Sequence, residues 1–443
     1  MQAADPQSLE REVRQLLADK ISGNQVGIWL LLPEHLRLGT WDLLCGWSGA
    51  DPLSVQPRLA LQVIHEAALC TCNLRCGRTL SQKGFEVANG LPFVGSDQAI
   101  HDLFEDHTVA QGQALQVALG KLRRASGHFK GSLLVLDPHR LKSYTKRQMR
   151  RQQSHGDQRP SKKAQTFFCL DAQTFQPVAF TMASGARTVA QATPELLELA
   201  RQVLCLEPAG TQRPLVLADE EHYTGEIFDQ VLQQPFDLLV PMKPHRGQQE
   251  RWRALSQSSF DRQWAGYALA RQTYPFGKSQ CMELIQRSGE RPEEFQFKGF
   301  LSTRLRDELE QLSTSFPQRW HVEEFFKFNQ ALGWQRAGTL NLHIRYGQMT
   351  MALIAQAVIH QFRQRVGMPY QSWDAPHLAK DVFSGLEGDV RVQDDTILVT
   401  YYNAPNAQQL RQHYEGTPEK LQVEGVDPRL PWLYNFKLDF RFK

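Results

Sequence analysis

Two short apolar runs, Ser132-Leu-Leu-Val-Leu-Asp137 and Pro214-Leu-Val-Leu-Ala-Asp219, carry the strongest structural signal in the chain. Each is typical of a buried strand that ends in an acidic residue, because an unbroken apolar run of this length suits a strand covered on both faces. If the two strands lie side by side and parallel, both carboxylates emerge at the carboxyl edge of the sheet, where open α/β sheets place their functional sites. The runs therefore predict an α/β domain in which Asp137 and Asp219 lie close together.

The segments around these runs predict a known order of strands and helices. Residues 163–170 and 176–184 predict a hairpin, and residues 193–205 predict an amphipathic helix. After the second run we expect a helix over 224–233 and a strand over 236–242. Three antiparallel strands followed by alternating helices and strands are the order of a ribonuclease-H-like fold. We therefore expect a mixed five-stranded sheet with flanking helices.

The rest of the chain predicts three further parts. Residues 1–125 contain short amphipathic helices, which indicate either a helix-turn-helix, with a helix starting at Ser96 and the chain continuing into 109–124, or an ordinary helical domain. The sequence after His245 is polar and contains short strand-like segments. Residues 389–402 predict a hairpin. The expected domains are a helical N-terminal domain (1–125), which would bind DNA if it holds a helix-turn-helix, a ribonuclease-H-like domain that carries the acids (126–245 and 316–366), a β-rich insertion (246–315) and a small C-terminal segment (367–443).

The composition indicates a globular protein of 443 residues, 41% hydrophobic and 22% charged. No apolar run approaches the roughly 20 residues needed to cross a bilayer, and the N-terminus lacks the features of a secretory signal, so we expect a cytoplasmic protein. The 7 cysteines fit reduced thiols better than a disulfide framework. Cys70, Cys72 and Cys76 could ligate zinc, but a fourth ligand at the usual spacing is missing, and buried or incidental thiols are the alternative.

A third acid comes from the segment Phe316-Pro-Gln-Arg-Trp-His-Val-Glu323, which predicts the start of a long helix. Arg319 and Glu323 are four residues apart and would share one helical face. The planar guanidinium suits a phosphate, which it can bind through two hydrogen bonds. The alternative is an exposed ion pair of the kind found on many helices, worth only a few tenths of a kcal/mol.

The same segment resembles the signature helix of DDE transposases from bacterial insertion sequences, in the insertion-sequence-four group. That signature is a tyrosine, two residues, an arginine, three residues, a glutamate, six residues and a lysine, usually with a tryptophan after the arginine. Arg319, Trp320 and Glu323 match it. Phe316 stands where the tyrosine is expected and Gln330 where the lysine is expected, while Lys327, one turn after Glu323, could supply the missing charge.

The resemblance covers about residues 130 to 365, and three blocks carry it in the same order as in the family. They are Leu134-Val-Leu-Asp137, Leu215-Val-Leu-Ala-Asp219-Glu-Glu-His-Tyr-Thr and Leu239-Val-Pro-Met-Lys243. The longer interval before Glu323 is what a β-rich insertion ahead of the last acidic helix implies.

The resemblance implies a DNA transposase that cleaves and joins DNA at the ends of an insertion sequence. Asp137, Asp219 and Glu323 would be its catalytic residues and would hold two Mg²⁺ ions, for which Mn²⁺ could substitute. Arg319 and Lys327 would contact DNA phosphates, and Trp320 could stack on an extruded base. Its partners would be double-stranded DNA, both the terminal inverted repeats and the target, with a homodimer in the DNA complex. The resemblance therefore also implies that the protein is nucleoid-associated.

A run of basic residues follows the first acid directly. It contains eight lysines and arginines and one acid, and it joins the strand of Asp137 to the next strand, so we expect it to lie where the DNA backbone passes. The alternative is a solvated loop, since Gln, Ser, Gly and Pro fill the gaps. Its basic members are Lys142, Lys146, Arg147, Arg150, Arg151, Arg159, Lys162 and Lys163.

Side chains near the motifs have alternative interpretations. Further acids are expected to face solvent or support the site (Glu220, Glu221, Glu324) or to form a turn (Asp171). The nearby histidines could shuttle protons, or they could be exposed or hydrogen-bonded without a role in the reaction (His139, His222, His321). Two tryptophans of the insertion are expected in its core (Trp252, Trp264).

Two other functions are considered. One is a catalytically inactive, transposase-derived DNA-binding protein, because the tyrosine and the lysine of the signature are replaced. The other is a ribonuclease-H-like nuclease without strand transfer, against which the large insertion and the C-terminal segment argue. The three intact acids favour an active transposase.

Overall fold

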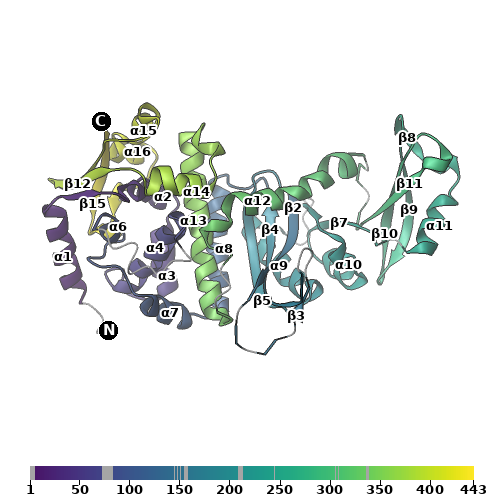
Figure 1. The fold of residues 1–443 in the computed structure, drawn as a ribbon, viewed down its shortest axis with the longest axis horizontal. Coiled ribbons are helices and arrows are strands. Elements are labelled where there is room, and N and C mark those ends of the chain that lie inside the picture. Colours follow the sequence, from purple (N-terminus) through teal and green to yellow (C-terminus); the bar gives the residue numbers. More distant parts are fainter. Residues whose placement is uncertain are drawn as a thin grey trace. The chain divides into compact units, whose positions relative to one another are not determined.

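The chain forms two compact units, one made of Met1–Ser126 together with Phe326–Lys443 and the other of Gly127–Phe325. Figure 1 shows the helices and strands of both units in the computed structural model. The described residues are 5–71, 83–143, 145–146, 148–149, 151–153, 158–207, 213–243, 245–304, 306–307, 309–335 and 339–443. Among them, no helix is both long enough and apolar enough to cross a membrane.

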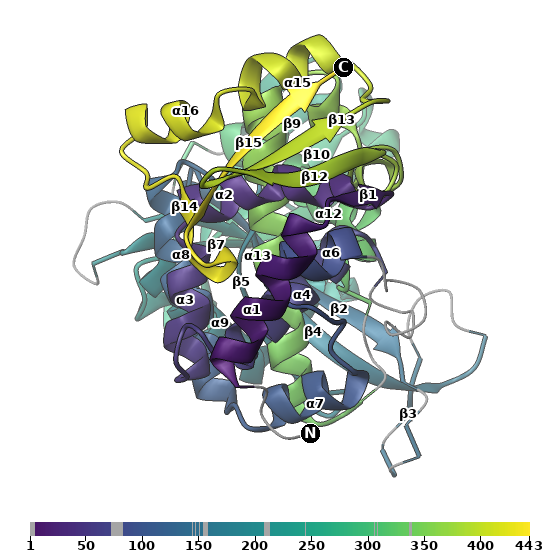
Figure 2. The same ribbon diagram turned by 90° about the vertical axis from the view of Figure 1, so that its left-hand side faces the viewer.

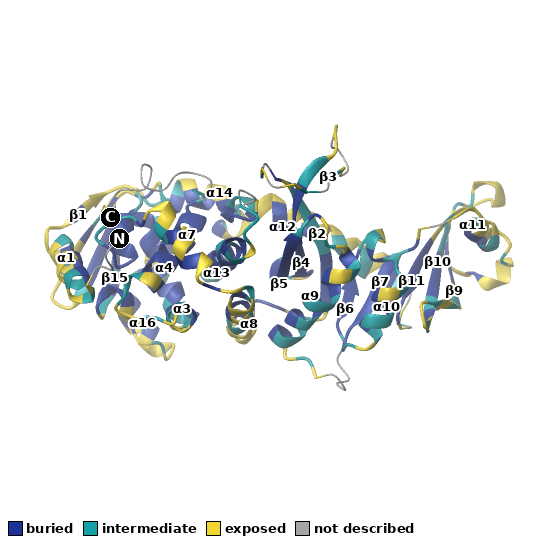
Figure 3. Ribbon diagram, turned by 90° about the horizontal axis from the view of Figure 1, so that it is seen from below, coloured by how far each residue is buried: buried dark blue, intermediate teal, exposed yellow. Residues whose placement is uncertain are grey.

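A mixed sheet forms the centre of the second unit, and its strands run in the order β5-β4-β2-β6-β7. The first three strands are antiparallel, whereas β2, β6 and β7 are parallel to one another. Figure 3 shows β4 and β5 as buried, in agreement with their almost unbroken runs of buried residues. The strands are β2 (Leu133–Lys142), β4 (Ser161–Asp171), β5 (Gln176–Ser184), β6 (Leu215–Leu217) and β7 (Asp237–Pro241).

Most of the elements expected in this unit are present. The β4–β5 hairpin and the helix α10 (Gly225–Leu232) are confirmed, and the helix expected over 193–205 is present as α9 (Val189–Leu204), which begins four residues earlier at the Thr188 cap. The prediction that the first strand ends at Asp137 was wrong, because β2 stays paired with β4 as far as Lys142, which lies opposite Lys163. Residues 138–142 therefore extend the β2–β4 hairpin beyond Asp137.

The β-rich segment continues the same sheet. Strand β11 pairs antiparallel with β7, with Phe300 opposite Pro241, and β10, β9 and β8 follow in turn. Trp252 is fully buried and donates a hydrogen bond to Glu283, as expected for a core residue, but Trp264 is 50% exposed and stacks on Tyr267. The prediction of a core position for Trp264 was wrong. The elements are α11 (Arg246–Arg253), η3 (Gln257–Ser259), β8 (Asp261–Trp264), β9 (Tyr267–Phe276), β10 (Ser279–Ser288), η4 (Pro292–Glu294) and β11 (Gln296–Ser302).

The acidic segment is helical, but its turns change type along the chain. A π-type turn, η5 (Glu310–Ser315), leads into a 3-10 turn, η6 (Phe316–Trp320), and then into α12 (His321–Asn329). The α-helix expected to start within this segment begins at His321, and Arg319 belongs to the preceding 3-10 turn. Glu323 lies in the first turn of α12.

The other unit combines helices with a sheet built from both ends of the chain. Strand β1 (Ile21–Gly23) pairs with β12 (Gly388–Gln393), and β13 (Thr396–Tyr401), β15 (Phe436–Phe442) and β14 (Arg429–Leu430) follow (Figure 2). The expected hairpin over 389–402 is confirmed. Ser96 caps α7, also as expected. The helices are α1 (Pro6–Ala18), α2 (Leu32–Arg37), α3 (Thr40–Ser48), α4 (Val55–Ala68), α6 (Lys83–Ala88), α7 (Asp97–Glu105), α8 (Val109–Ala125), α13 (Leu342–Val366), α14 (Ala375–Leu378), α15 (Ala407–Tyr414) and α16 (Thr417–Val423).

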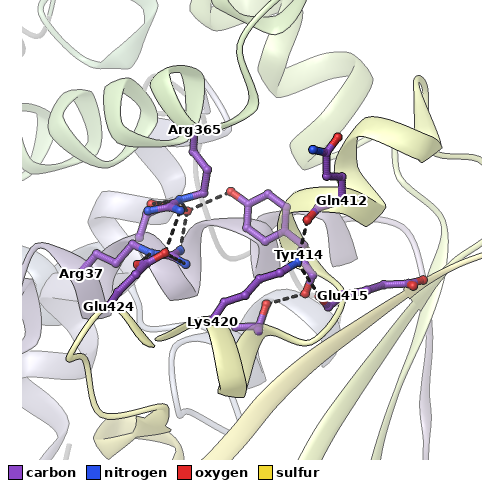
Figure 4. A network of polar contacts seen from close by, with 9 residues as sticks. Arg37, Arg365, Gln412, Tyr414, Glu415, Lys420 and Glu424 are labelled. Carbon is purple, nitrogen blue, oxygen red and sulfur yellow. Dashed lines mark hydrogen bonds and ion pairs between the residues drawn. The ribbon is translucent and has the colours of Figure 1, made fainter. Parts of the chain in front are cut away.

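A network of polar contacts joins the N-terminal and C-terminal segments of this unit, and Figure 4 shows Arg37, Arg365, Tyr414 and Glu424 within it. Glu34 on α2 is fully buried and accepts hydrogen bonds from Arg37 (2.9 Å) and from the Tyr414 hydroxyl (2.9 Å), while Arg365 lies 3.1 Å away. Glu424 pairs with the same two arginines at 2.6 and 3.0 Å. Removing one partner would leave a buried charge unpaired, so the network should tolerate such a change poorly. Residues 367–443 therefore share one compact unit with the N-terminal helices.

Candidate active site

The register of two parallel strands places the first two acids. Leu133 to Val135 of β2 pair with Leu215 to Leu217 of β6, and the parallel pairing ends there. Asp137 and Asp219 each follow the last paired residue of their strand by two positions. Equal offsets from one register bring the two carboxylates to the same sheet edge, as the sequence predicted.

The two carboxyl groups differ in their protonation. Burial, together with the nearby charge of Asp219, raises the pKa of Asp137 from 3.8 to about 7, against the opposing effect of Arg319 and Arg140. Burial also raises the pKa of Asp219, but the hydrogen bond and charge of His222, the backbone N–H of Glu221 and Arg319 outweigh it and leave that pKa below its usual value. The pair therefore holds one proton near neutral pH more readily than two isolated aspartates would.

Hydrogen bonds fix the carboxylate of Asp219. Its Oδ1 accepts from the Glu221 backbone N–H at 3.0 Å and lies 2.8 Å from His222 Nδ1. The first contact caps the short turn η2 (Glu220–His222), and His222 is buried. The adjacent turn therefore orients the side chain before any ligand binds, as hydrogen bonds around metal-ligating carboxylates do.

Arg140 and Glu221 form an ion pair beside the two aspartates, and the sequence carries no signal that Arg140 belongs to the site. Arg140, three residues after Asp137 on β2, donates to both carboxylate oxygens of Glu221 and, from Nε, to Gln165 Oε1 at 3.0 Å. The Glu221 contact raises the pKa of Arg140, and both aspartates add to this effect. Glu221 is therefore a supporting residue that holds a cation close to the acids, one of the two roles expected for it.

Contacts with the sheet anchor the start of α12. His321 Nδ1 lies 2.5 Å from the Ala172 carbonyl oxygen, and its ring is 4.4 Å from that of Phe175 in the β4–β5 turn. Phe325 packs on Phe168, which is the cross-strand partner of Asp137. The helix start is thus held against β4 and the β4–β5 turn, and β4 is the strand that pairs with Asp137. His321 has a structural contact here, one of the two roles considered for it.

Arg319 reaches the two aspartates electrostatically, whereas Glu323 faces solvent. The guanidinium acts on the pKa of both Asp137 and Asp219, and it lies 5.2 Å from the centre of the Trp320 ring. Trp320 is 56% exposed, and Glu323 and Lys327 are exposed as well. In the described part of the chain, no group of three or more His, Cys, Asp or Glu side chains is arranged to hold a metal ion. Convergence of all three acids therefore stays a prediction.

Several other expected residues can now be placed. Asp171 is buried and accepts from the backbone N–H groups of Lys130, Gly131, Gln173 and Thr174, which is the turn-forming role expected for it. Burial lowers the pKa of His139 to about 4, so its ring is neutral at physiological pH.

The basic run lies at the far end of the β2–β4 hairpin. Lys142, Lys146 and Arg151 are exposed, and β3 (Arg151–Gln152) pairs with β4. Arg147 and Arg150, as well as Cys72 and Cys76, lie outside the described residues, while Cys70 is half-buried.

The donors at the sheet edge fit a hard divalent cation. Carboxylate oxygens are the ligands that such cations prefer, and Asp137 and Asp219 lie close enough for the charge of one to act on the other. A mixed α/β domain with paired acids at the carboxyl edge of parallel strands, next to an arginine, defines a class of enzymes that act on phosphodiesters.

Comparison with known proteins identifies the family. The sequence profile of the family described as "Transposase DDE domain" matches residues 128–357, more than half of the chain. The chain therefore belongs to the transposase DDE domain family. It is a DNA transposase, an enzyme that cleaves and joins DNA, and its family uses divalent metal ions.

No curated protein sequence matches the chain. Among solved structures, the chain is similar to one described as the cryo-EM structure of the piggyBac transposase synaptic complex with hairpin DNA. The sequence identity is 10%, the similarity covers 80% of this chain and 79% of that chain, and the TM-score is 0.42.

The pKa of Asp137 predicts a pH-dependent effect of Asp137→Asn on the free energy of unfolding of the metal-free protein. Between the unfolded value near 3.8 and the folded value of about 7, the folded protein keeps a proton that the unfolded chain releases. The contribution of Asp137 to stability therefore falls as pH rises through this window. Relative to wild type, Asp137→Asn should gain stability from pH 4 to pH 7 and then level off.

Urea unfolding in EDTA between pH 4 and pH 8.5 measures this difference. Asp219→Asn is the comparison variant, because the lowered pKa of Asp219 contributes stability that is lost only as pH falls below its unfolded value, so the titration of Asp219 itself lies below this pH range. A difference between Asp137→Asn and wild type that does not change with pH would contradict the assignment.

Proposed function

We propose that Asp137, Asp219 and Glu323 are the catalytic carboxylates of an insertion-sequence-four type transposase that cuts and joins DNA at the terminal inverted repeats of its element. The proposal rests on the positions of Asp137 and Asp219, each two residues beyond the last paired residue of two neighbouring parallel strands. The charge of Arg319 opposes the rise in pKa that burial causes in both carboxyl groups. The strand order β5-β4-β2-β6-β7, antiparallel and then parallel, supports a ribonuclease-H-like catalytic core.

Asp137, Asp219 and Glu323 would hold two Mg²⁺ ions, for which Mn²⁺ could substitute. The chemistry that divalent cations supply in such a site is activation of the attacking oxygen and stabilisation of the leaving oxygen. Asp219 is already oriented by His222 and by the Glu221 backbone N–H, so it needs little rearrangement to act as a ligand. Asp137 must give up its proton to become one, which makes metal binding weaker below pH 7. Glu323, exposed one turn after Arg319, would complete the set.

The reaction is an in-line displacement at phosphorus. An oxygen nucleophile, from water or from a DNA 3′-hydroxyl, forms a new P–O bond while the opposite P–O bond breaks, and the leaving oxygen takes up a proton. Arg319 has the planar donor geometry to hold the non-bridging oxygens of that phosphate. Two inverted repeats related by a two-fold axis suit a symmetric pair of proteins, and we therefore propose a homodimer in the DNA complex.

The carboxylate assignment predicts a loss of DNA cleavage without a loss of DNA binding. Asp137→Asn, Asp219→Asn and Glu323→Gln each remove a negatively charged ligand and should lower the cleavage rate by at least about a thousandfold in Mg²⁺. Glu324→Gln is the matched control, because Glu324 is an equally exposed acid next to Glu323, and it should cleave like wild type. The measurements are cleavage of a plasmid that carries the element's ends and affinity for a duplex with the terminal repeat.

Full cleavage by Glu323→Gln would remove that residue from the catalytic set. Equal losses of binding and cleavage in both aspartate variants would show that these acids support the fold rather than the reaction.

We further propose that the basic run contacts DNA phosphates independently of sequence. The β2–β4 hairpin carries it away from Asp137, and at about 3.4 Å per residue Lys142 lies roughly 17 Å along the strand from Asp137, well within the reach of bound DNA. Lys142, Lys146 and Arg151 are exposed at this end of the hairpin.

Neutralising Lys146, Arg147, Arg150 and Arg151 together should weaken binding to terminal and random duplexes alike. The slope of log affinity against log salt should flatten by up to about four units, at roughly 0.9 per lost contact. Titrations at several salt concentrations measure this slope. An unchanged slope would mean that the run is a solvated loop, and a loss confined to the terminal repeat would mean that it reads bases.

A further inference from the structure

Lys298 lies on β11, in the segment that continues the sheet, and its ammonium group sits over two aromatic rings. Its Nζ is 5.0 Å from the ring centre of Phe300 and 5.7 Å from that of Phe316. The two rings pack edge to face with their centres 4.8 Å apart. An ammonium held by ring faces keeps its N–H groups available to other acceptors.

The same aromatic contact brings Lys298 close to Arg319. Phe316 and Arg319 belong to one short turn, η6, so packing of Phe316 on Phe300 fixes that turn against β11. Burial lowers the pKa of Lys298, and the charge of Arg319 lowers it further. The two cations are thus near enough to repel each other.

Neither cation is neutralised by a direct contact. Within the residues that the structure describes, Lys298 and Arg319 take part in no hydrogen bond or ion pair, and aromatic rings are their close partners. Two adjacent cations without a carboxylate bonded to either gain free energy when an anion binds between them. Arg319 also acts on Asp137 and Asp219, so that anion would lie at the edge of the proposed site.

We propose that Lys298 and Arg319 together bind one phosphate of the DNA backbone beside the catalytic acids. This inference rests on the proposed function of the site. In the resembling family a lysine follows the glutamate in the signature, whereas this chain has Gln330 there. Lys298 supplies a cation from a different element, and Phe316, at the position of the signature tyrosine, helps to hold it.

The test compares Lys298→Gln with Lys298→Arg and with Lys278→Gln. Lys278 is the matched control, because it is an exposed lysine of the same β-rich segment, at the turn between β9 and β10. The probe is a duplex carrying the inverted repeat that flanks the coding sequence. Lys298→Gln should bind about tenfold more weakly and flatten the salt slope by about 0.9, Lys298→Arg should keep most of the affinity, and Lys278→Gln should match wild type.

A second measurement identifies the phosphate. Duplexes with a neutral methylphosphonate at successive positions around the cleaved bond are titrated with wild type, Lys298→Gln and Arg319→Gln. At one position the substitution should weaken wild type but have little further effect on either variant, and that position should be the same for both. Fully additive losses at every position would overturn the inference, as would equal behaviour of Lys298→Gln and Lys278→Gln.

These outcomes separate the inference from the proposed function. If wild type neither binds the terminal duplex nor cleaves it with a divalent metal, the proposed function fails, and the shared phosphate fails with it. If wild type does both and Lys298→Gln equals wild type in affinity and salt slope, only the inference fails. Thermal unfolding of Lys298→Gln and Lys298→Arg checks that a lost affinity reflects the missing charge rather than a damaged fold.

Discussion

Three pairs of residues between β2 and β6 determine where the active site forms. The parallel register of Leu133 to Val135 with Leu215 to Leu217 sets Asp137 and Asp219 at equal distances beyond the last paired residue. A slip of one residue in either strand would turn one carboxylate to the opposite face of the sheet. The contact of Arg140 on β2 with Glu221 after β6 depends on this register, whereas the contact of His222 with Asp219 is local to one turn.

The electrostatics of the site follow from that placement. Two carboxyl groups brought together at a buried edge cannot both ionise easily, and the hydrogen bonds to Asp219 decide which of them keeps its charge. Arg319 offsets part of the repulsion without bonding to either acid, which leaves its guanidinium available for a phosphate. The repulsion between the two carboxylates is reduced when a cation binds. As pH rises and Asp137 loses its proton, the free energy of unfolding should therefore fall while the affinity for a divalent cation rises.

Local pattern predicted much of the catalytic unit, because its strands are short apolar runs and its helices carry caps. The β4–β5 hairpin, α10 and the paired positions of Asp137 and Asp219 follow from such patterns. Contacts between distant segments left no comparable signal: the pairing of β2 with β4 beyond Asp137, of β11 with β7 and of β1 with β12 depends on partners far along the chain. The sequence carries no signal for Arg140 and Lys298 for the same reason, since their contacts are with Glu221 and Phe316 on other elements.

The most direct test of this account is anomalous diffraction from crystals of the protein with terminal-repeat DNA and Mn²⁺. We predict a manganese peak bonded to carboxylate oxygens of both Asp137 and Asp219 at about 2.1 Å, with Glu323 turned toward the site. The same peak should disappear in Asp219→Asn crystals and persist in Glu324→Gln crystals. Manganese bound elsewhere, with Asp137 and Asp219 not sharing an ion, would contradict the account.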